Sequence, residues 1–171
     1  ANAVHYPSLA EFPDVEMAGL CDVNPERLRA TAGRFGIART YADYRRMLDE
    51  TAPDAVYVLM PPHHLFDIVV DCLSRGLHVF IEKPPGVTRE QTRRMADAAA
   101  RHGCLIIVGF QRRFAPLLVR AKAEVLARGP LLQCEASFFK CYRNQPPYYG
   151  GAIDILTSDA IHSVDLLRWM G

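Results

Sequence analysis

The feature that most constrains the fold of this chain is an alternation of short apolar runs with longer amphipathic stretches over its first two thirds. The apolar runs cover residues 15–21, 55–60, 78–82 and 104–110, and each has the length and composition of a strand. Runs this continuously apolar are typical of strands buried on both faces, and the helical stretches between them indicate parallel βαβ units. We therefore predict an α/β fold with a doubly wound parallel sheet.

Local signals mark where the helices of this pattern begin and end. Asn24 followed by Pro25 is a typical helix start, with the Asn side chain as the cap and Pro in the first turn. Thr88 with Gln91 three residues later predicts a capping box, and Gly76 suits a left-handed helix end. The predicted helices cover residues 25–35, 44–50 and 64–75, and a fourth runs from Thr88 to about residue 102.

The pattern changes after residue 113. We predict a helix at about residues 117–127, a strand with one wet face at 131–140 and a helix at 156–170. One strand and one helix cannot enclose a core, so this part is expected to be the beginning of a second, α+β domain. The predicted domains are therefore residues 1–113 and 114–171.

The glycines predict that part of the first domain is missing. Nucleotide-binding sheets usually carry Gly-x-Gly-x-x-Gly after their first strand, and the 11 glycines here include no Gly-x-Gly. The chain also begins in a helix-like stretch, residues 1–10, with no strand before it. We expect the first strand and the phosphate-binding loop to be absent, and dinucleotide binding by this chain alone to be weak.

Composition excludes several classes of function. The 20 Lys and Arg residues balance 19 Asp and Glu residues, with no basic run of the kind that nucleic-acid binding needs. The apolar runs are much shorter than the roughly 20 residues of a membrane span, and no signal peptide is visible. Five scattered cysteines without a Cys-x-x-Cys pair argue against a disulfide framework or a zinc site. We expect a cytoplasmic protein without a bound metal.

In doubly wound sheets, ligands bind at the carboxyl ends of the strands, so the residues that follow each strand are the candidates for a site. Asp22 follows the first strand, where a carboxylate either accepts hydrogen bonds from a dinucleotide ribose or caps the next turn. Lys83 follows the third strand and precedes Pro84 and Pro85, which stiffen the chain. A rigid lysine of this kind suits a substrate hydroxyl, although a solvated loop lysine is the plainer interpretation.

The last predicted helix carries Asp159, His162 and Asp165 at a spacing of three residues, which places them on one stripe. An imidazole oriented by a carboxylate is a natural general base for an alcohol proton. The alternative is structural: Asp165 pairs with Arg168, and His162 packs in the core.

Several segments, taken in order, resemble those of a known family. The resemblance is carried by HVFIEKPPGVT at residues 78–88, VGFQRRFAP at 108–116 and GGAIDILTSDAIHSVDLLRWMG at 150–171. The segments CDVNPERL and MPPHHLFDIVVDCLSRG are similar to the same family. This is the glucose–fructose oxidoreductase, inositol dehydrogenase and MocA family, abbreviated Gfo/Idh/MocA. The chain resembles roughly half of a member.

The resemblance implies an incomplete Rossmann-like NAD(P)-binding domain followed by the start of a substrate and dimerisation domain. It implies an oxidoreductase that transfers a hydride between a nicotinamide cofactor, NAD in preference to NADP, and a carbinol of a sugar, inositol or related polyol. Its partners would be that substrate and, at full length, further copies of the chain. Two alternatives stay open: a non-catalytic nucleotide-binding regulator of the same fold, and an NAD-dependent glycosidase.

The resemblance also implies roles for individual residues. Lys83 would contact the nicotinamide ribose and the reacting hydroxyl, His162 would take the hydroxyl proton, and Asp159 would orient the site. The residues implied for cofactor binding are Asp22, Pro61, Pro62, Glu82, Lys83 and Pro84, with Asp22 favouring NAD.

Two positions depart from the family pattern. Members usually carry the helix carboxylate four residues before the histidine, where this chain has Ser158, whereas Asp159 is three residues before His162. Many members also have a histidine at the position of Leu65, and this chain has His64 instead. The role implied for Asp159 depends on this difference in spacing.

Overall fold

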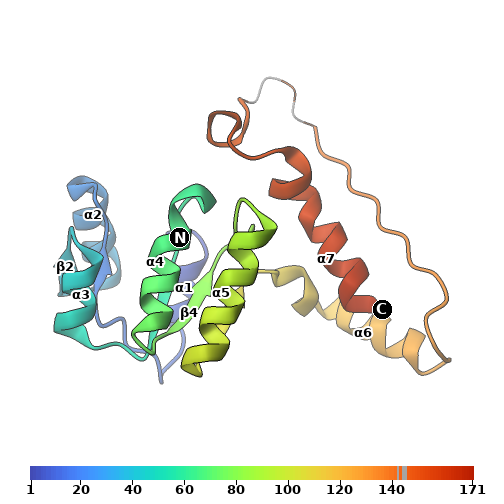
Figure 1. Ribbon diagram of the computed structural model, residues 1–171, viewed down its shortest axis with the longest axis horizontal. Helices are drawn as coiled ribbons and strands as arrows, with labels where there is room; N and C mark the ends of the chain where they lie inside the picture. The colour runs from blue at the N-terminus through green and yellow to red at the C-terminus, as the bar shows by residue number, and fades with distance from the viewer. Residues whose placement is uncertain (142, 144–145) are drawn as a thin grey trace. The chain divides into compact units, whose positions relative to one another are not determined.

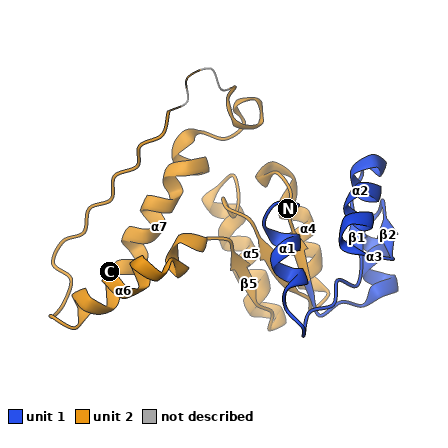
Figure 2. Ribbon diagram, turned by 180° about the vertical axis from the view of Figure 1, so that it is seen from behind, with its two compact units in different colours: residues 1–55 blue, residues 56–171 orange. Residues whose placement is uncertain are grey.

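The computed structural model describes residues 1–141, 143 and 146–171 (Figure 1). The chain divides into two compact units, Ala1–Ala55 and Val56–Gly171, which Figure 2 shows in different colours. The domain boundary predicted after residue 113 lies inside the second unit, and the predicted division into domains stays a prediction. None of the helices in the described ranges is long and apolar enough to cross a membrane.

The first unit contains two short parallel strands and three helices. Its elements are α1 (His5–Ala10), β1 (Leu20–Cys21), α2 (Pro25–Phe35), β2 (Thr40–Tyr41) and α3 (Tyr44–Thr51). The strands pair in parallel, with Leu20 opposite Thr40 and Cys21 opposite Tyr41. The strand predicted at residues 15–21 is thus only two residues long, and β2 was not predicted because its sequence has no apolar run.

The predicted start and end of α2 are confirmed. The Asn24 side chain accepts hydrogen bonds from the backbone N–H groups of Glu26 and Arg27, both at 3.0 Å. Gly36 ends the helix with a φ of 66°, a left-handed conformation that glycine adopts without strain. The Asn24 cap at the start of the helix fixes the turn between β1 and α2, and this turn contains Asp22.

The second unit begins with alternating strands and helices. Its first elements are β3 (Ala55–Val58), α4 (Pro62–Ser74), β4 (His78–Ile81), α5 (Arg89–His102) and β5 (Ile106–Val108). The strands form one sheet in the order β3-β4-β5. Strands β4 and β5 are parallel, with Phe80 opposite Ile107. The α/β class with parallel strands is confirmed, as is the capping box of Thr88 and Gln91 at the start of α5.

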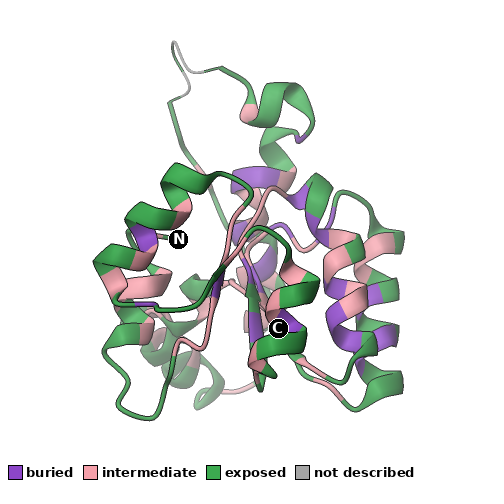
Figure 3. Cartoon of the chain, turned by 90° about the vertical axis from the view of Figure 1, so that its left-hand side faces the viewer, coloured by how far each residue is buried: buried purple, intermediate pink, exposed green. Residues whose placement is uncertain are grey.

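Helices α4 and α5 pack against each other, as Figure 1 shows, and supply most of the core of the second unit. The largest fully buried side chains are those of Leu65, Val69, Cys72, Leu73, Ile81 and Met95. Figure 3 colours the buried parts of the chain purple. Burial alternates along the strands: Val56 and Val58 are buried, whereas Tyr57 between them is 41% exposed. The expectation that both faces are buried is therefore wrong, because the helices that contact these strands cover one face.

The rest of the second unit consists of helical segments joined by extended chain. They are η1 (Gln111–Phe114), α6 (Pro116–Leu126), η2 (Tyr148–Gly151), the π-helical turn η3 (Leu156–Ala160) and α7 (Ile161–Met170). The strand predicted at residues 131–140 is not formed. Leu132 and Phe139 are 94% and 93% exposed there, since a strand needs a neighbouring strand and the described residues provide none. Residues 142, 144 and 145, which follow this segment, lie outside the described residues.

Candidate active site

The carboxyl ends of β4 and β5 bring Glu82 and Gly109 together. Parallel strands end at the same edge of a sheet, and these two residues directly follow Ile81 and Val108, which are paired in register. A Cβ atom on Gly109 would lie 3.3 Å from the carboxylate of Glu82, so a side chain at this position would displace it. Glu82 also accepts a hydrogen bond from the backbone N–H of Lys83 at 3.1 Å. Glu82 is thus held where the chain leaves the sheet.

Lys83 connects this edge of the sheet to the segment before α7. Its Nζ donates a hydrogen bond to the backbone carbonyl of Ser158 at 2.5 Å. The same Nζ lies 3.8 Å from Oδ1 of Asp159, and the lysine side chain is 23% exposed. The Lys83–Pro84 peptide bond is cis. The predicted lysine is therefore a partly buried group with defined partners rather than a solvated loop residue.

The polar stripe predicted on the last helix is buried. Asp159, His162 and Asp165 are each less than a tenth exposed, as is Ser158. The stripe begins in the π-helical turn η3, and turns of this kind occur frequently at functional sites. Polar side chains buried this deeply need partners or a function, and the contacts of each are therefore informative.

His162 combines burial with an unused ring nitrogen. Among the described residues, its Nδ1 atom is buried and has no hydrogen-bond partner. Its ring stands edge-on to Phe110, with the ring centres 6.3 Å apart. Burial lowers the pKa of this histidine, and the positive charges of Lys83 and Arg112 lower it further, while Asp165 and Asp159 act in the opposite direction. The imidazole is therefore neutral at neutral pH and able to accept a proton.

Asp165 fixes α7 to the segment that follows β5. Arg113 of η1 donates from Nε to Oδ2 of Asp165 at 2.8 Å and from its second terminal nitrogen to Oδ1. This two-point contact, and the charge of Asp165, raise the pKa of Arg113. The alternative interpretation of the stripe named Arg168 as the partner of Asp165, and the structure shows Arg113 instead. His162 is one turn before this clamp.

Lys140 is a member of the site that sequence reasoning missed. Its Nζ donates to Oδ2 of Asp159 at 2.9 Å and to the hydroxyl of Tyr148 at 3.1 Å. The residue lies in the segment that was predicted to be a strand, where no spacing relates it to Asp159. One signal was available: Lys83 and Lys140 are two of only three lysines in a chain with 17 arginines.

The prolines predicted to line the cofactor cleft open helix α4. Pro61 precedes the helix and accepts a hydrogen bond at its carbonyl from the N–H of His64 at 2.9 Å, and Pro62 is its buried first residue. Leu65, at the position where many family members carry a histidine, is buried in the core. His64, the histidine named in its place, is exposed. The ring of the neighbouring His63 stands edge-on to that of Tyr149, with centres 5.6 Å apart.

Asp22 lies in the first unit, directly after β1. Its Oδ1 accepts a hydrogen bond from the backbone N–H of Asn24 at 2.9 Å, and its Oδ2 lies 2.7 Å from Nε of Arg27. The local capping contact that was one of the two interpretations is therefore present. The ribose contact stays a prediction.

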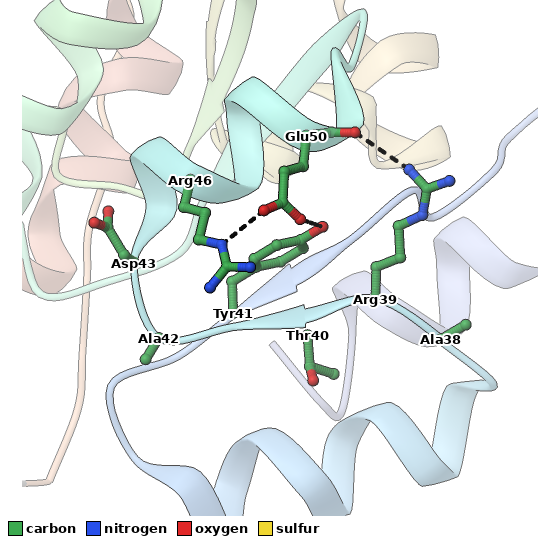
Figure 4. Close-up of a pocket in the computed structure, with 8 residues that line it drawn as sticks. All are labelled: Ala38, Arg39, Thr40, Tyr41, Ala42, Asp43, Arg46 and Glu50. Atoms are coloured by element: carbon green, nitrogen blue, oxygen red, sulfur yellow. Dashed lines mark hydrogen bonds and ion pairs between the residues drawn. The ribbon is translucent and has the colours of Figure 1, made fainter.

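The first unit also has an open pocket of about 410 Å³ between β2 and α3 (Figure 4). Glu50 of α3 accepts hydrogen bonds from Nε of Arg46 at 2.6 Å and from the hydroxyl of Tyr41 at 3.0 Å, and both lower the pKa of its carboxyl. The lining residues are Ala38, Arg39, Thr40, Tyr41, Ala42, Asp43, Arg46 and Glu50. None of the predicted site residues is among them, and we assign this pocket no part in the chemistry.

Comparison with curated proteins identifies named dehydrogenases and a catabolic protein. The chain is 34% identical over 115 residues to D-glucoside 3-dehydrogenase of Escherichia coli K12. The aligned region is 67% of this chain and 33% of that protein. The chain is also 32% identical over 176 residues to the rhizopine catabolism protein MocA of Rhizobium meliloti. This aligned region is 98% of this chain and 53% of MocA. The chain thus spans between a third and about half of the length of these relatives.

Solved structures show the same fold. A putative dehydrogenase from Bordetella bronchiseptica RB50 superposes with a TM-score of 0.83 at 23% identity, covering 98% of this chain and 45% of that one. A scyllo-inositol dehydrogenase from Lactobacillus casei, solved with bound NAD(H) and scyllo-inositol, superposes with a TM-score of 0.67 at 26% identity. That superposition covers 72% of this chain and 37% of the other.

Residues 1–110 match the family model described as an oxidoreductase family with an NAD-binding Rossmann fold. This match covers more than half of the 171 residues. It includes Asp22, the prolines Pro61 and Pro62 before helix α4, and the segment around Lys83. The chain therefore belongs to the Gfo/Idh/MocA family of oxidoreductases.

Proposed function

We propose that the protein is an NAD-dependent dehydrogenase that oxidises a ring carbinol of a sugar, inositol or related polyol, or catalyses the reverse reduction. The family and the names of the relatives support this proposal. The observation that carries it is the group of Lys83, Asp159 and His162: the ammonium of Lys83 contacts Ser158 and Asp159, and burial, together with the charge of that ammonium, keeps the imidazole of His162 neutral.

The chain's own residues fit a nicotinamide cofactor and an alcohol. Within the second unit, Pro61, Pro62, Glu82, Lys83 and Pro84 would hold the nicotinamide end at the edge of the sheet. The adenosine ribose contact is proposed for Asp22 from its place after β1 alone. When bound, the nicotinamide accepts the hydride from the carbinol carbon. Leaving the Nδ1 atom of His162 buried without a partner costs about 1–3 kcal/mol, which a hydrogen-bonding ligand relieves.

Lys83 binds and polarises the reacting hydroxyl in this proposal. An ammonium has three donors, and one of them is used on the carbonyl of Ser158. A second donor directed at the carbinol oxygen stabilises negative charge there as the proton leaves. The contact with Ser158 fixes the direction of the remaining donors.

His162 takes the hydroxyl proton at a ring nitrogen. A general base must be unprotonated, and burial together with the charges of Lys83 and Arg112 keeps this imidazole neutral. Arg113, through Asp165, holds the helix from which His162 projects. Asp159 positions Lys83 and contributes a compensating negative charge.

The test is NADH formation by the full-length protein with a panel of sugars and inositols, for the wild type and for K83M and H162N. We expect each substitution to lower kcat by about a hundredfold or more, with NAD binding retained. The matched control is K122M, because Lys122 contacts Trp169 and lies outside the cluster. Wild-type rates in both K83M and H162N would show that the roles are wrongly assigned.

A further inference from the structure

Two ammonium groups share the carboxylate of Asp159, and they are not equivalent. Lys140 contacts Oδ2 at hydrogen-bond distance, 2.9 Å, whereas Lys83 stays 3.8 Å from Oδ1. The carboxylate itself is only 10% exposed. A carboxylate this deeply buried and beside a lysine is expected to pair with it directly, because solvent screens the attraction weakly. Lys83 instead directs its hydrogen bond to the carbonyl of Ser158 and stays at the longer distance from Asp159, while Lys140 holds Oδ2.

We propose that Lys140 is a positioning residue, which occupies Asp159 so that the ammonium of Lys83 remains available to the substrate hydroxyl. This inference rests on the proposed function. Lys140 is itself anchored from a second side, since it donates to the hydroxyl of Tyr148 and its Nζ lies 5.5 Å from the centre of that ring.

The choice of lysine supports this role. A guanidinium is planar and tends to bind both oxygens of a carboxylate at once, as Arg113 does with Asp165. An ammonium binds as a point charge and here occupies Oδ2, which leaves Oδ1 facing Lys83. The two cations that contact Asp159, Lys140 by a hydrogen bond and Lys83 at ion-pair distance, are lysines in a chain that has 17 arginines and one further lysine.

A double-mutant cycle separates positioning from direct catalysis. In the wild-type background, we expect K140M to lower kcat about tenfold, with the KM values for NAD and polyol changed less than twofold, because Asp159 then captures Lys83. In the D159N background, where residue 159 no longer carries the carboxylate that would capture Lys83, K140M is expected to change kcat less than about twofold. K122M is the matched control. Equal losses from K140M in both backgrounds would overturn the inference.

A second measurement needs neither substrate nor cofactor. Lysine labelled at the ε carbon gives one NMR signal for each of the three lysines, which K83R, K122M and K140M assign. We expect D159N to shift the signals of Lys83 and Lys140, and K140M to shift that of Lys83, with Lys122 unchanged in both. A Lys83 signal that is unaffected by K140M would refute the positioning role. Absence of NADH formation by the wild type would instead refute the proposed function.

Discussion

At the scale of single residues, the protonation state of His162 is set by its surroundings. Burial lowers its pKa most, followed by the charges of Lys83 and Arg112. Protonation of the base stops catalysis, so the acid limb of the pH profile of kcat/KM is expected below the ordinary histidine value of about 6.5.

Replacing Arg112 by glutamine tests this electrostatic account. Removing a cation makes the protonated imidazole less unfavourable, so the pKa of His162 rises and the acid limb moves to higher pH. The opposing charges of Asp159 and Asp165 remain in place. The measurement is kcat/KM against pH for the wild type and R112Q, with R128Q as a control on an exposed arginine. A limb that stays in place or moves to lower pH would contradict the prediction.

Asp22 and Arg27 make a second prediction at this scale, about the choice of cofactor. The carboxylate of Asp22 pairs with the guanidinium of Arg27 at 2.7 Å. In D22S, that guanidinium loses its partner and can bind the 2′-phosphate of NADP, while the repulsion of the carboxylate is removed. We expect the ratio of kcat/KM with NADP to that with NAD to rise about tenfold or more. The gain should disappear in the double variant D22S/R27Q, and its persistence there would exclude Arg27 as the cause.

At the scale of secondary-structure elements, the helices could be predicted and the strands only in part. Both α2 and α5 begin directly after the expected caps, because capping depends on residues three positions apart. The strand expected at residues 131–140 is not formed, since pairing depends on a neighbour that a local pattern does not contain. An apolar run also does not reveal which of its faces a helix will cover.

In the candidate site, too, local sequence patterns indicate individual residues but not their contact partners from distant parts of the chain. The place of Lys83 after a strand and the spacing of His162 on its helix made them candidates, and the family resemblance implied their roles. The partners that give them their chemistry come from elsewhere: Arg113 is 52 residues from Asp165, and Lys140 is 19 residues from Asp159. No periodic pattern relates such pairs, so the structure was needed to find them.

The capping box of α5 allows a prediction at this scale. The Thr88 hydroxyl accepts from the N–H of Gln91 at 3.2 Å, and the Gln91 side chain accepts from the N–H groups of Val87 and Thr88. T88A removes the first of these bonds and is expected to lower the free energy of unfolding by about 1 kcal/mol. T88S keeps the hydroxyl and should lose less than half of that. Urea unfolding followed by the fluorescence of the single tryptophan measures both, and an equal loss in T88S would argue against the cap.

At the scale of the whole molecule, the five cysteines report where the chain is packed. Cys72 is fully buried in α4, Cys21 and Cys104 are half-buried, and Cys134 and Cys141 are exposed. Burial raises the pKa of the Cys72 thiol to about 11, with a smaller contribution from the charge of Asp71. Alkylation requires the thiolate, so both its small population and the surrounding core protect Cys72.

We therefore expect iodoacetamide at pH 8 to modify Cys134 and Cys141 first and Cys72 at least about a hundredfold more slowly, as read by peptide mass spectrometry. In concentrated urea, all five thiols should react at similar rates, which serves as the control for intrinsic reactivity. Native-state labelling of Cys72 as fast as that of Cys134 would mean that α4 is not packed against α5 and the sheet. The edge of that sheet positions Lys83, so loss of this core would also remove the basis of the proposed site.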